Sequence, residues 1–244
     1  MKKVVDTQGQ SLLLTRPIEA SQACASFLIE KGISCEIAPM MEYIDISHEK
    51  PEQGVYNAYI FTSAQGITSF HGDEFDVPVF CVGNKTADTA RARGYRRVYN
   101  AQGDLEALVA LIKEQLNKAA RMLYVRGQDV SKDIVSVLDG YDCDEIVSYE
   151  ARFVDRMPDE ICHLIRNGHI WGVSFFSKRT ALNFLSLAQK AQLLESLEKI
   201  KCLCISQGVV ECVHAVSWGE VRAARTPNLD GMYALINEIT STGD

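Results

Sequence analysis

The chain of 244 residues is 47% hydrophobic and 23% charged, which is ordinary for a globular protein and excludes a disordered, collagen-like or fibrous chain. At about 100–200 residues per domain, its length allows one large domain or two small ones. The formal net charge of −7 gives no overall positive field for nucleic acid or anionic lipid, and on charge alone it argues against a polyanionic ligand.

The first predicted elements form a strand–helix–strand unit that the chain later repeats. Residues 11–17 predict a strand that ends in a turn, a helix follows to about Lys31, and residues 35–38 predict a second strand. The same order recurs about 110 residues later. The second copy has a strand at 122–127, a helix around Lys132–Leu138 and a strand at 144–148.

A longer unit is also repeated, at about 58–116 and again at about 172–239. Each copy begins with a β-rich run that leads into a helix, continues with a buried strand and a second helix, and closes with a small strand and an apolar helix. Matching serine and glycine positions of the two copies lie 114 or 123 residues apart. Strands of about four to six residues that alternate with helices of about ten to fifteen indicate parallel sheets built from βαβ units. The sequence therefore predicts an α/β protein with two similar units.

The order of the repeats leaves two domain arrangements open. The units are either 1–120 and 121–244, or one is inserted into the other, so that 42–150 forms one domain and 1–40 plus 152–244 forms the second. Two linker segments, about 39–46 and 148–155, alternate apolar and polar residues as half-exposed strands do. Pairing of these linker strands as an antiparallel ribbon favours the insertion.

The ends of the chain and its cysteines bear on location and metal binding. Met1-Lys2-Lys3 is not followed by the apolar region of a signal peptide, and no stretch approaches the length of a membrane span, so we expect a cytoplasmic protein. The eight cysteines mostly lie in apolar runs, form no Cys-x-x-Cys pair and have no histidine at zinc-ligand spacing. We interpret them as buried, reduced thiols and predict no metal site.

Candidate ligand-binding residues follow several of the predicted strands. Ligands of open parallel sheets bind beyond the carboxyl ends of the strands, where helix N-termini offer free N–H donors to anions. Hydroxyl groups and glycines lie at these places in 62–66, 82–87 and 176–180, and Thr15-Arg16 and Arg126-Gly127 place a guanidinium at the same edge. Ordinary N-capping explains any one of these serines and threonines equally well. No dinucleotide, Walker or nucleophile-elbow motif occurs, so the chemistry is expected to need no cofactor.

These motifs, taken in order, resemble those of the uroporphyrinogen-III synthase family over nearly the whole chain. The ordered set is Thr15-Arg16-Pro17, Pro39-Met40-Met41-Glu42-Tyr43, Phe61-Thr62-Ser63, Val82-Gly83-Asn84-Lys85-Thr86-Ala87, Tyr124-Val125-Arg126-Gly127, Tyr149 and Phe175-Phe176-Ser177. The resemblance implies two flavodoxin-like domains joined by a two-stranded antiparallel ribbon, which selects the insertion. It also implies that the linear tetrapyrrole hydroxymethylbilane is dehydrated and cyclised to uroporphyrinogen III, with inversion of ring D and without a cofactor.

The resemblance implies roles for individual residues. Tyr149 matches the tyrosine that the family offers as a general acid for the leaving hydroxyl, and a half-buried structural tyrosine is the alternative. Lys201 precedes a strand where some relatives carry a lysine, and it ranks last among the candidates. The predicted substrate-binding residues are Thr15, Arg16, Thr62, Ser63, Gly83, Thr86, Arg126, Gly127, Ser177 and Ser206.

The chain departs from the family pattern in one place. Where the family usually reads Ile-Gly-x-Thr-Thr-Ala, this chain has Ile205-Ser206-Gln207-Gly208-Val209-Val210, so the threonine hydroxyls are missing. The departure supports the alternatives of a non-catalytic binder of a small polyanion or a degraded relative of the synthase. We further expect a monomer that receives its substrate from the enzyme that makes hydroxymethylbilane. The acidic residues are expected on outer helix faces, because net charge does not describe a local site.

Overall fold

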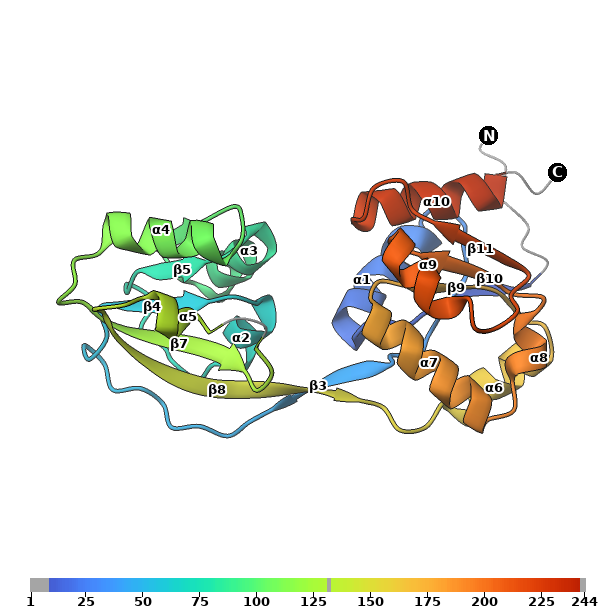
Figure 1. The fold of residues 1–244 in the computed structure, drawn as a ribbon, viewed down its shortest axis with the longest axis horizontal. Coiled ribbons are helices and arrows are strands. Elements are labelled where there is room, and N and C mark those ends of the chain that lie inside the picture. The colour runs from blue at the N-terminus through green and yellow to red at the C-terminus, as the bar shows by residue number, and fades with distance from the viewer. Residues whose placement is uncertain (1–8, 131–132, 242–244) are drawn as a thin grey trace. The chain divides into compact units, whose positions relative to one another are not determined.

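The structure is a computed structural model that describes residues 9–130 and 133–241. Met1-Lys2-Lys3 and Lys132, on which sequence predictions fall, lie outside the described residues. The chain divides into two compact units, which we call unit 1 (Met1–Glu42 with Arg152–Asp244) and unit 2 (Tyr43–Ala151). Figure 1 shows their elements in ribbon form, and each unit is described by itself.

Unit 1 is built on a five-stranded sheet in which every neighbouring pair of strands is parallel. The spatial order is β11 (Glu220–Ala223), β10 (Lys201–Cys204), β9 (Ile170–Phe175), β1 (Ser11–Leu14) and β2 (Cys35–Ile37). Short apolar strands suit this position because helices cover both faces of a parallel sheet. The unit 1 core therefore forms in two layers, one on each face.

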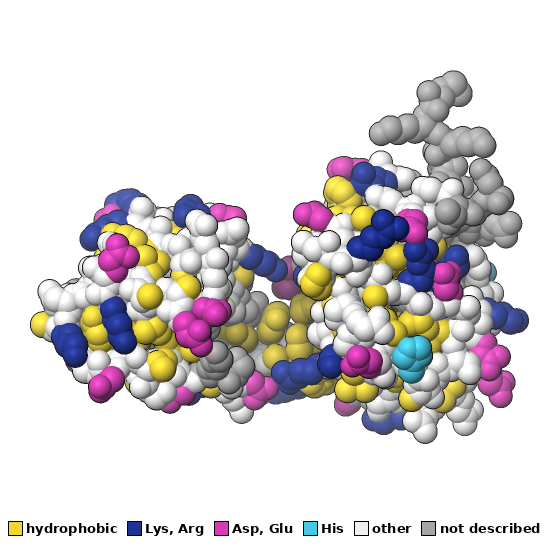
Figure 2. Space-filling view, turned by 45° about the horizontal axis from the view of Figure 1, so that its top comes forward, with side chains coloured by type: hydrophobic (Ala, Val, Ile, Leu, Met, Phe, Trp, Pro, Cys, Tyr) yellow, Lys and Arg dark blue, Asp and Glu magenta, His cyan; other side chains and the backbone are white. Residues whose placement is uncertain are grey.

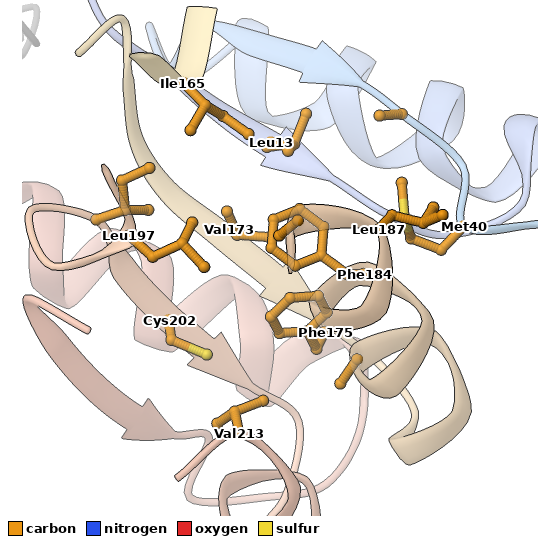
Figure 3. Close-up of a cluster of buried hydrophobic side chains, with 14 of the residues drawn as sticks. Leu13, Met40, Ile165, Val173, Phe175, Phe184, Leu187, Leu197, Cys202 and Val213 are labelled. Carbon is orange, nitrogen blue, oxygen red and sulfur yellow. The ribbon is translucent and has the colours of Figure 1, made fainter. Parts of the chain in front are cut away.

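Helices α1 (Ile18–Ile29) and α10 (Leu229–Ser241) cover one face of this sheet. Helices α6 (Asp159–Arg166), α7 (Lys178–Lys190), α8 (Leu194–Leu197) and α9 (Gln207–Val213) cover the other. Strand side chains alternate between the two layers, with Leu13 on the α7 face and Leu12 and Leu14 on the α1 face. Figure 3 shows the α7-face cluster, where Phe175 of β9 packs against Phe184 of α7.

Unit 2 is built on a six-stranded sheet. Its order is β3 (Met41–Asp45), β8 (Asp142–Phe153), β7 (Arg121–Gly127), β4 (Ala58–Phe61), β5 (Val79–Cys81) and β6 (Val98–Asn100). The five strands from β8 to β6 pair in parallel. The hydrogen bonds from Ile46 N to Ser148 O and from Val154 N to Met40 O show that β3 runs antiparallel to β8, because the partner number falls as the residue number rises.

Four helices cover the unit 2 sheet. Helices α2 (Ala64–Ser69) and α3 (Asn84–Arg93) supply the cluster on one face, and α4 (Leu105–Gln115) and α5 (Ile134–Val137) supply the cluster on the other. The short helix α2 is held at its end by Arg93, whose guanidinium donates to the carbonyls of Ile67 and Phe70. This contact satisfies carbonyls that the helix itself leaves unpaired.

The two sheets have the same spatial plan, although the chain enters them at different strands. In unit 1 the chain visits β1, β2, β9, β10 and β11; in unit 2 the strands in the same positions are β7, β8, β4, β5 and β6. Both correspond to the flavodoxin-like order, in which the first and third positions lie side by side at the sheet centre. The predicted α/β fold class, with two parallel sheets and an antiparallel strand pair, is confirmed.

Several element predictions were wrong in length. The segments predicted as separate strands at 144–148 and 148–155 form one continuous strand, β8, which contains neither glycine nor proline to interrupt it. The predicted helix Lys132–Leu138 is only the four residues of α5, and the turn that follows has Gly140 at φ 80°. Helix α2, with six residues, is shorter than the expected ten to fifteen. None of these differences changes the strand order.

The surface carries both signs of charge close together. Figure 2 shows lysines and arginines interspersed with aspartates and glutamates over the visible face of each unit. In the part of the chain that the structure describes, no helix is long and apolar enough to span a membrane. All eight cysteines have free thiols.

Candidate functional site

The predicted site residues lie at the carboxyl ends of the central strands of each sheet. In unit 1 they follow β1, β9 and β10. In unit 2 they follow β4 and β5, Arg126 and Gly127 are the last two residues of β7, and Tyr149 lies on β8. The strand order reverses direction between β1 and β9 and between β7 and β4, and this is the place where open α/β sheets bind ligands. The residues of each unit are considered in turn.

Tyr149 and Ser63 form the best-defined polar pair of unit 2. The Tyr149 hydroxyl lies 2.8 Å from Ser63 Oγ, and its ring meets the ring of Tyr43 edge to face, with 5.5 Å between ring centroids. Ser63 is the N-cap of α2, and its Oγ accepts a hydrogen bond from Gly66 N at 3.1 Å. Because Ser63 Oγ still has its own proton to give, it can donate to Tyr149 and leave the phenolic proton free for another acceptor.

Gly127 makes room for the Tyr149 ring. A Cβ atom at position 127 would lie 2.7 Å from Tyr149 Cζ and 3.0 Å from its hydroxyl oxygen, which is closer than real contacts allow. The pairing of β7 with β8 shifts register just before Gly127, which faces Tyr149 across the ladder. The absence of a side chain at 127 therefore fixes where the phenol can lie.

Arg126 is engaged within unit 2. Its Nε donates to Glu145 at 2.7 Å, and its Nη1 donates to the carbonyls of Gly127 and Gln128 at 3.1 and 3.3 Å. Because one carboxylate and two carbonyls already take these donors, Arg126 mainly holds the segment that follows β7. The structure thus places Arg126 beside Gly127 and Tyr149, where it supports the position of the ring.

Thr62 and Ser63 are adjacent in sequence but have different neighbours. The hydroxyl of Thr62 lies 3.0 Å from the hydroxyl of Tyr124, and both line a cavity of about 360 Å³ together with Asp104 and Asp129. Burial raises the pKa of Tyr124, so its phenol stays protonated. The two aspartates make this cavity a poor place for a carboxylate. The structure brings Ser63, but not Thr62, to Tyr149.

Gly83 and Thr86 lie at the start of α3. Gly83 is the N-cap, in extended backbone with no atom within 4 Å of a Cβ built there, so a ligand could approach its backbone closely. Thr86 is buried in the first turn of the same helix. These two residues offer backbone N–H groups and one hydroxyl, separately from the Tyr149–Ser63 pair.

In unit 1, Thr15 and Arg16 differ in availability. Thr15 is fully buried, and its hydroxyl donates to Ser174 O at 2.7 Å, which ties β1 to β9. The guanidinium of Arg16 lies 4.3 Å from the centre of the Phe176 ring, in cation–π geometry. Among the described residues, no carboxylate pairs with Arg16, so its charge can meet an anion at the edge of the sheet.

Ser177 and Ser206 begin the helices that follow β9 and β10. Ser177 Oγ accepts from Thr180 N at 3.1 Å and lies 2.7 Å from the Thr180 hydroxyl, whereas Ser206 makes no side-chain bond to α9. Lys201 lies at the opposite, amino end of β10, with its ammonium 3.4 Å from a Glu220 carboxylate oxygen. Lys201 is therefore not grouped with the two serines.

A charge pattern separates α2, α3, α7 and α9 from the other described helices, which include α1 after β1 and α5 after β7. The first turns of α2, α3, α7 and α9 contain no acidic residue. Acidic side chains do occupy the first turn or N-cap of α1, α4, α5, α6, α8 and α10. Carboxylates stabilise helix N-termini, so the four acid-free starts are exceptions that would repel a bound anion least. The sequence reasoning missed this pattern, although it can be read from residues 63–66, 83–86, 177–180 and 206–209.

Two partners of the predicted residues were also missed. Tyr124 is buried beside Thr62, and the ring of Phe176 supports Arg16; both residues occur in the quoted motifs, but their contacts depend on the fold. Within residues 9–130 and 133–241, no group of three histidines, cysteines or acidic residues is arranged to hold a metal ion. At its strand ends each unit presents hydroxyls and backbone N–H donors, and unit 1 adds the Arg16 cation; such groups suit an anionic organic ligand.

Comparisons with known proteins bear on the fold and the family of the chain. A solved structure of uroporphyrinogen-III synthetase from Helicobacter pylori matches with a TM-score of 0.60 at 16% identity, covering 94% of this chain and 99% of that one. A mutant uroporphyrinogen III synthase from Thermus thermophilus matches with a TM-score of 0.47 at 13% identity, covering 96% and 100%. A comparison with curated protein sequences finds no match. A family model described as "Uroporphyrinogen-III synthase HemD" matches residues 22–234. The chain therefore belongs to the uroporphyrinogen-III synthase family, whose members are cyclising hydro-lyases of tetrapyrrole biosynthesis.

Proposed function

We propose that the protein is a uroporphyrinogen-III synthase that converts hydroxymethylbilane to uroporphyrinogen III, with loss of water and inversion of ring D. Family membership supports the reaction class. The observation that carries the proposal is the Tyr149–Ser63 pair, in which a capping serine can donate to the phenol while the phenolic proton remains available. A dehydrating cyclisation needs such a proton donor at the leaving hydroxyl.

The proposed reaction begins when Tyr149 donates its proton to the terminal hydroxyl of the bilane. Water leaves, and the ring that carried it becomes a cationic azafulvenium ion that keeps its N–H proton. The substituted α-carbon of ring D attacks this electrophile to form a spiro intermediate, which fragments and recloses in the inverted orientation. The last step releases a proton from ring D, and the Tyr149 phenolate takes it back, so the net change is the loss of one water.

Ser63 contributes by hydrogen bonding to the Tyr149 oxygen. When the phenol gives up its proton, the Ser63 O–H can donate to the phenolate, and the N–H of Gly66 in turn polarises Ser63. Hydrogen bonds to the charged form stabilise it relative to the neutral form. Gly127 and Arg126 fix the ring and the segment beside it, which makes them positioning residues.

The proposed substrate-binding groups are the Arg16 guanidinium, the hydroxyls of Ser177 and Ser206, and the backbone at Gly83 and Thr86. Ser63 is left out, because its one proton is donated to Tyr149. Acid-free helix starts support this assignment, because the substrate carries several carboxylates. Thr15 and Thr62 are left out, since the Thr15 hydroxyl is consumed inside the sheet and Thr62 faces two aspartates.

The free thiols of all eight cysteines are consistent with a cytoplasmic location, where thiols stay reduced.

We also propose that the bilane is handed over by the enzyme that forms it, since hydroxymethylbilane closes spontaneously. A channelling assay tests this point: with both enzymes present, less type I product should form than the rate constants measured separately for free hydroxymethylbilane require, and agreement with those rate constants would contradict the hand-over.

The experiment that tests the proposed function gives purified protein freshly made hydroxymethylbilane and measures the isomer ratio of the product. Spontaneous closure yields the type I isomer, so an enzyme must yield type III in excess. If only type I forms, the protein is a binder or a degraded relative of the synthase. A Tyr149→Phe variant keeps the ring and loses the donor; we expect its kcat to fall about 10²-fold or more. Unchanged turnover would remove Tyr149 from the acid role.

A further inference from the structure

Lys178, the first residue of α7, extends across to the beginning of α9. A Cβ atom built on Gly208 would lie 2.8 Å from Lys178 Cε and 3.1 Å from its Nζ. The lysine side chain thus occupies the space that any larger residue at position 208 would need. Gly208 belongs to the segment in which this chain departs from its family pattern, and here the glycine makes room for a cation from the neighbouring helix.

The Lys178 ammonium has no counter-ion in the part of the chain that the structure describes. It forms no ion pair with a described carboxylate, and its side chain is exposed. The first turn of α7 contains Lys178 and Arg179 and no acidic residue. Cations at a helix N-terminus oppose the helix dipole, so this placement is unfavourable unless an anion is bound nearby.

The Ser206 hydroxyl lies near the same point and is also uncommitted. Its Oγ is 3.9 Å from the Cβ built on Gly208, and it makes no capping bond to α9. Gly208 and Val209 stand where the family pattern has its two threonines, and neither carries a hydroxyl; Val209 is buried in the core cluster of unit 1. A carboxylate above Gly208 could therefore accept from the Lys178 ammonium and the Ser206 hydroxyl together.

We propose that Lys178 is a substrate-binding residue that replaces the missing threonines by holding one carboxylate of the linear tetrapyrrole above Gly208. This inference rests on the proposed function, because it assumes a substrate with several carboxylates. It assigns to Gly208 the task of leaving room for the ammonium. It also accounts for Lys178, unpaired among the described residues, in the first turn of α7, since the other cation there, Arg179, lies over the ring of Phe153.

Kinetic measurements on Lys178→Ala test the proposal. We expect KM for hydroxymethylbilane to rise about 10-fold with kcat within twofold, because the lost interaction binds substrate and transition state alike. Lys178→Arg should retain most of the affinity. Lys190→Ala is the matched control, since it removes the same charge from the last turn of the same helix and should leave KM unchanged. Lys178→Ala should unfold at the same temperature as the unaltered protein or higher.

Gly208→Ala provides a second, independent test. The new methyl group would displace the flexible end of Lys178, and alanine favours a helix more than glycine does, so KM should rise without a loss of stability. In the Lys178→Ala background, Gly208→Ala should have no further effect on KM. Equal effects of Gly208→Ala in both backgrounds would overturn the proposal, as would a KM of Lys178→Ala within twofold of the unaltered protein.

A binding experiment separates this inference from the proposed function. Uroporphyrin III, the stable oxidised form of the expected product, is titrated into each variant, and its fluorescence reports the dissociation constant. Weaker binding by Lys178→Ala but not by Lys190→Ala supports the inference even if no type III product forms. Type III synthesis with equal KM and equal dissociation constants in all variants overturns the inference and leaves the proposed function intact. Absence of binding by the unaltered protein also overturns the inference.

Discussion

Gly127→Ala is the substitution for which the structure predicts the clearest loss of catalysis. The backbone of Gly127 is not in the left-handed region, so alanine meets no conformational barrier there. Its methyl group would lie 2.7 Å from Tyr149 Cζ, whereas carbon atoms pack at about 3.5–4.0 Å, so the ring must move by about 1 Å. The effect on the protein therefore acts through Tyr149.

A displacement of about 1 Å is enough to break the 2.8 Å hydrogen bond between Tyr149 and Ser63. Misplacement of a catalytic group by this amount costs about 10²-fold in rate, which corresponds to about 2.7 kcal/mol in activation free energy. We expect kcat to fall by about that factor, with KM changed much less. Overpacking of this kind also lowers the free energy of unfolding by about 1–3 kcal/mol.

The assay combines initial rates of uroporphyrinogen III formation with urea unfolding of the same preparations. In a Tyr149→Ala background the ring is gone, and Gly127→Ala should no longer lower the free energy of unfolding. The reasoning is refuted if Gly127→Ala keeps the kcat and the stability of the unaltered protein.

Two further predictions concern the cap and the buried thiols. Ser63→Ala should lower the free energy of unfolding by about 1 kcal/mol, because it removes the N-cap of α2, and it should also lower kcat. Asp133→Ala, which removes the N-cap of α5, is the control and should lower the free energy of unfolding by a similar amount with kcat unchanged. Equal kcat values in the two variants would contradict the role of Ser63. Burial raises the pKa of the Cys81 thiol from 9.0 to about 12. The buried neutral thiol therefore contributes its full stabilisation below about pH 9, and this stabilisation is lost as the pH rises towards 12. Over that range the free energy of unfolding should fall by up to about 1.4 kcal/mol per pH unit. Measured by urea unfolding between pH 8 and about 11, the free energy of unfolding should fall less steeply with pH for Cys81→Ala than for the unaltered protein. Equal slopes for the two proteins would refute the assignment.

The internal repeats made the fold predictable, because each strand and helix start could be compared with a second copy. Parallel sheets followed from the βαβ units, whereas the flavodoxin-like strand order was implied only by the family resemblance; short apolar strands such as β10 were recognisable from Cys202–Cys204 alone. Lengths were less predictable. The length of strand β8 depends on its pairing with neighbouring strands, and the end of the short helix α5 depends on the turn at Gly140. Local sequence patterns do not predict such tertiary effects well.

The candidate site was predictable as a set of positions but not as a set of contacts. The sequence placed Thr15 and Arg16 at the same edge, yet one hydroxyl is consumed inside the sheet and the other side chain lies over Phe176. The closeness of Gly127 to Tyr149 and of Lys178 to Gly208 joins residues from different elements. Such contacts depend on strand register and helix packing, which the patterns visible in a single sequence do not reveal.

The different entry points of the chain into the two sheets have a consequence for folding. The hydrogen bond from Thr15 to Ser174 joins residues 159 positions apart. During synthesis, β1 therefore cannot pair with β9 until more than half of the chain has been made. Unit 2 lies entirely between them and can fold first, during synthesis. Once Ile46 and Ser148 are paired, the open loop between Thr15 and Ser174 shrinks to roughly 60 residues, which reduces the entropic cost of its closure by about 1 kcal/mol. Folding of the inserted unit thus brings the two segments of unit 1 close together, although they are far apart in the sequence.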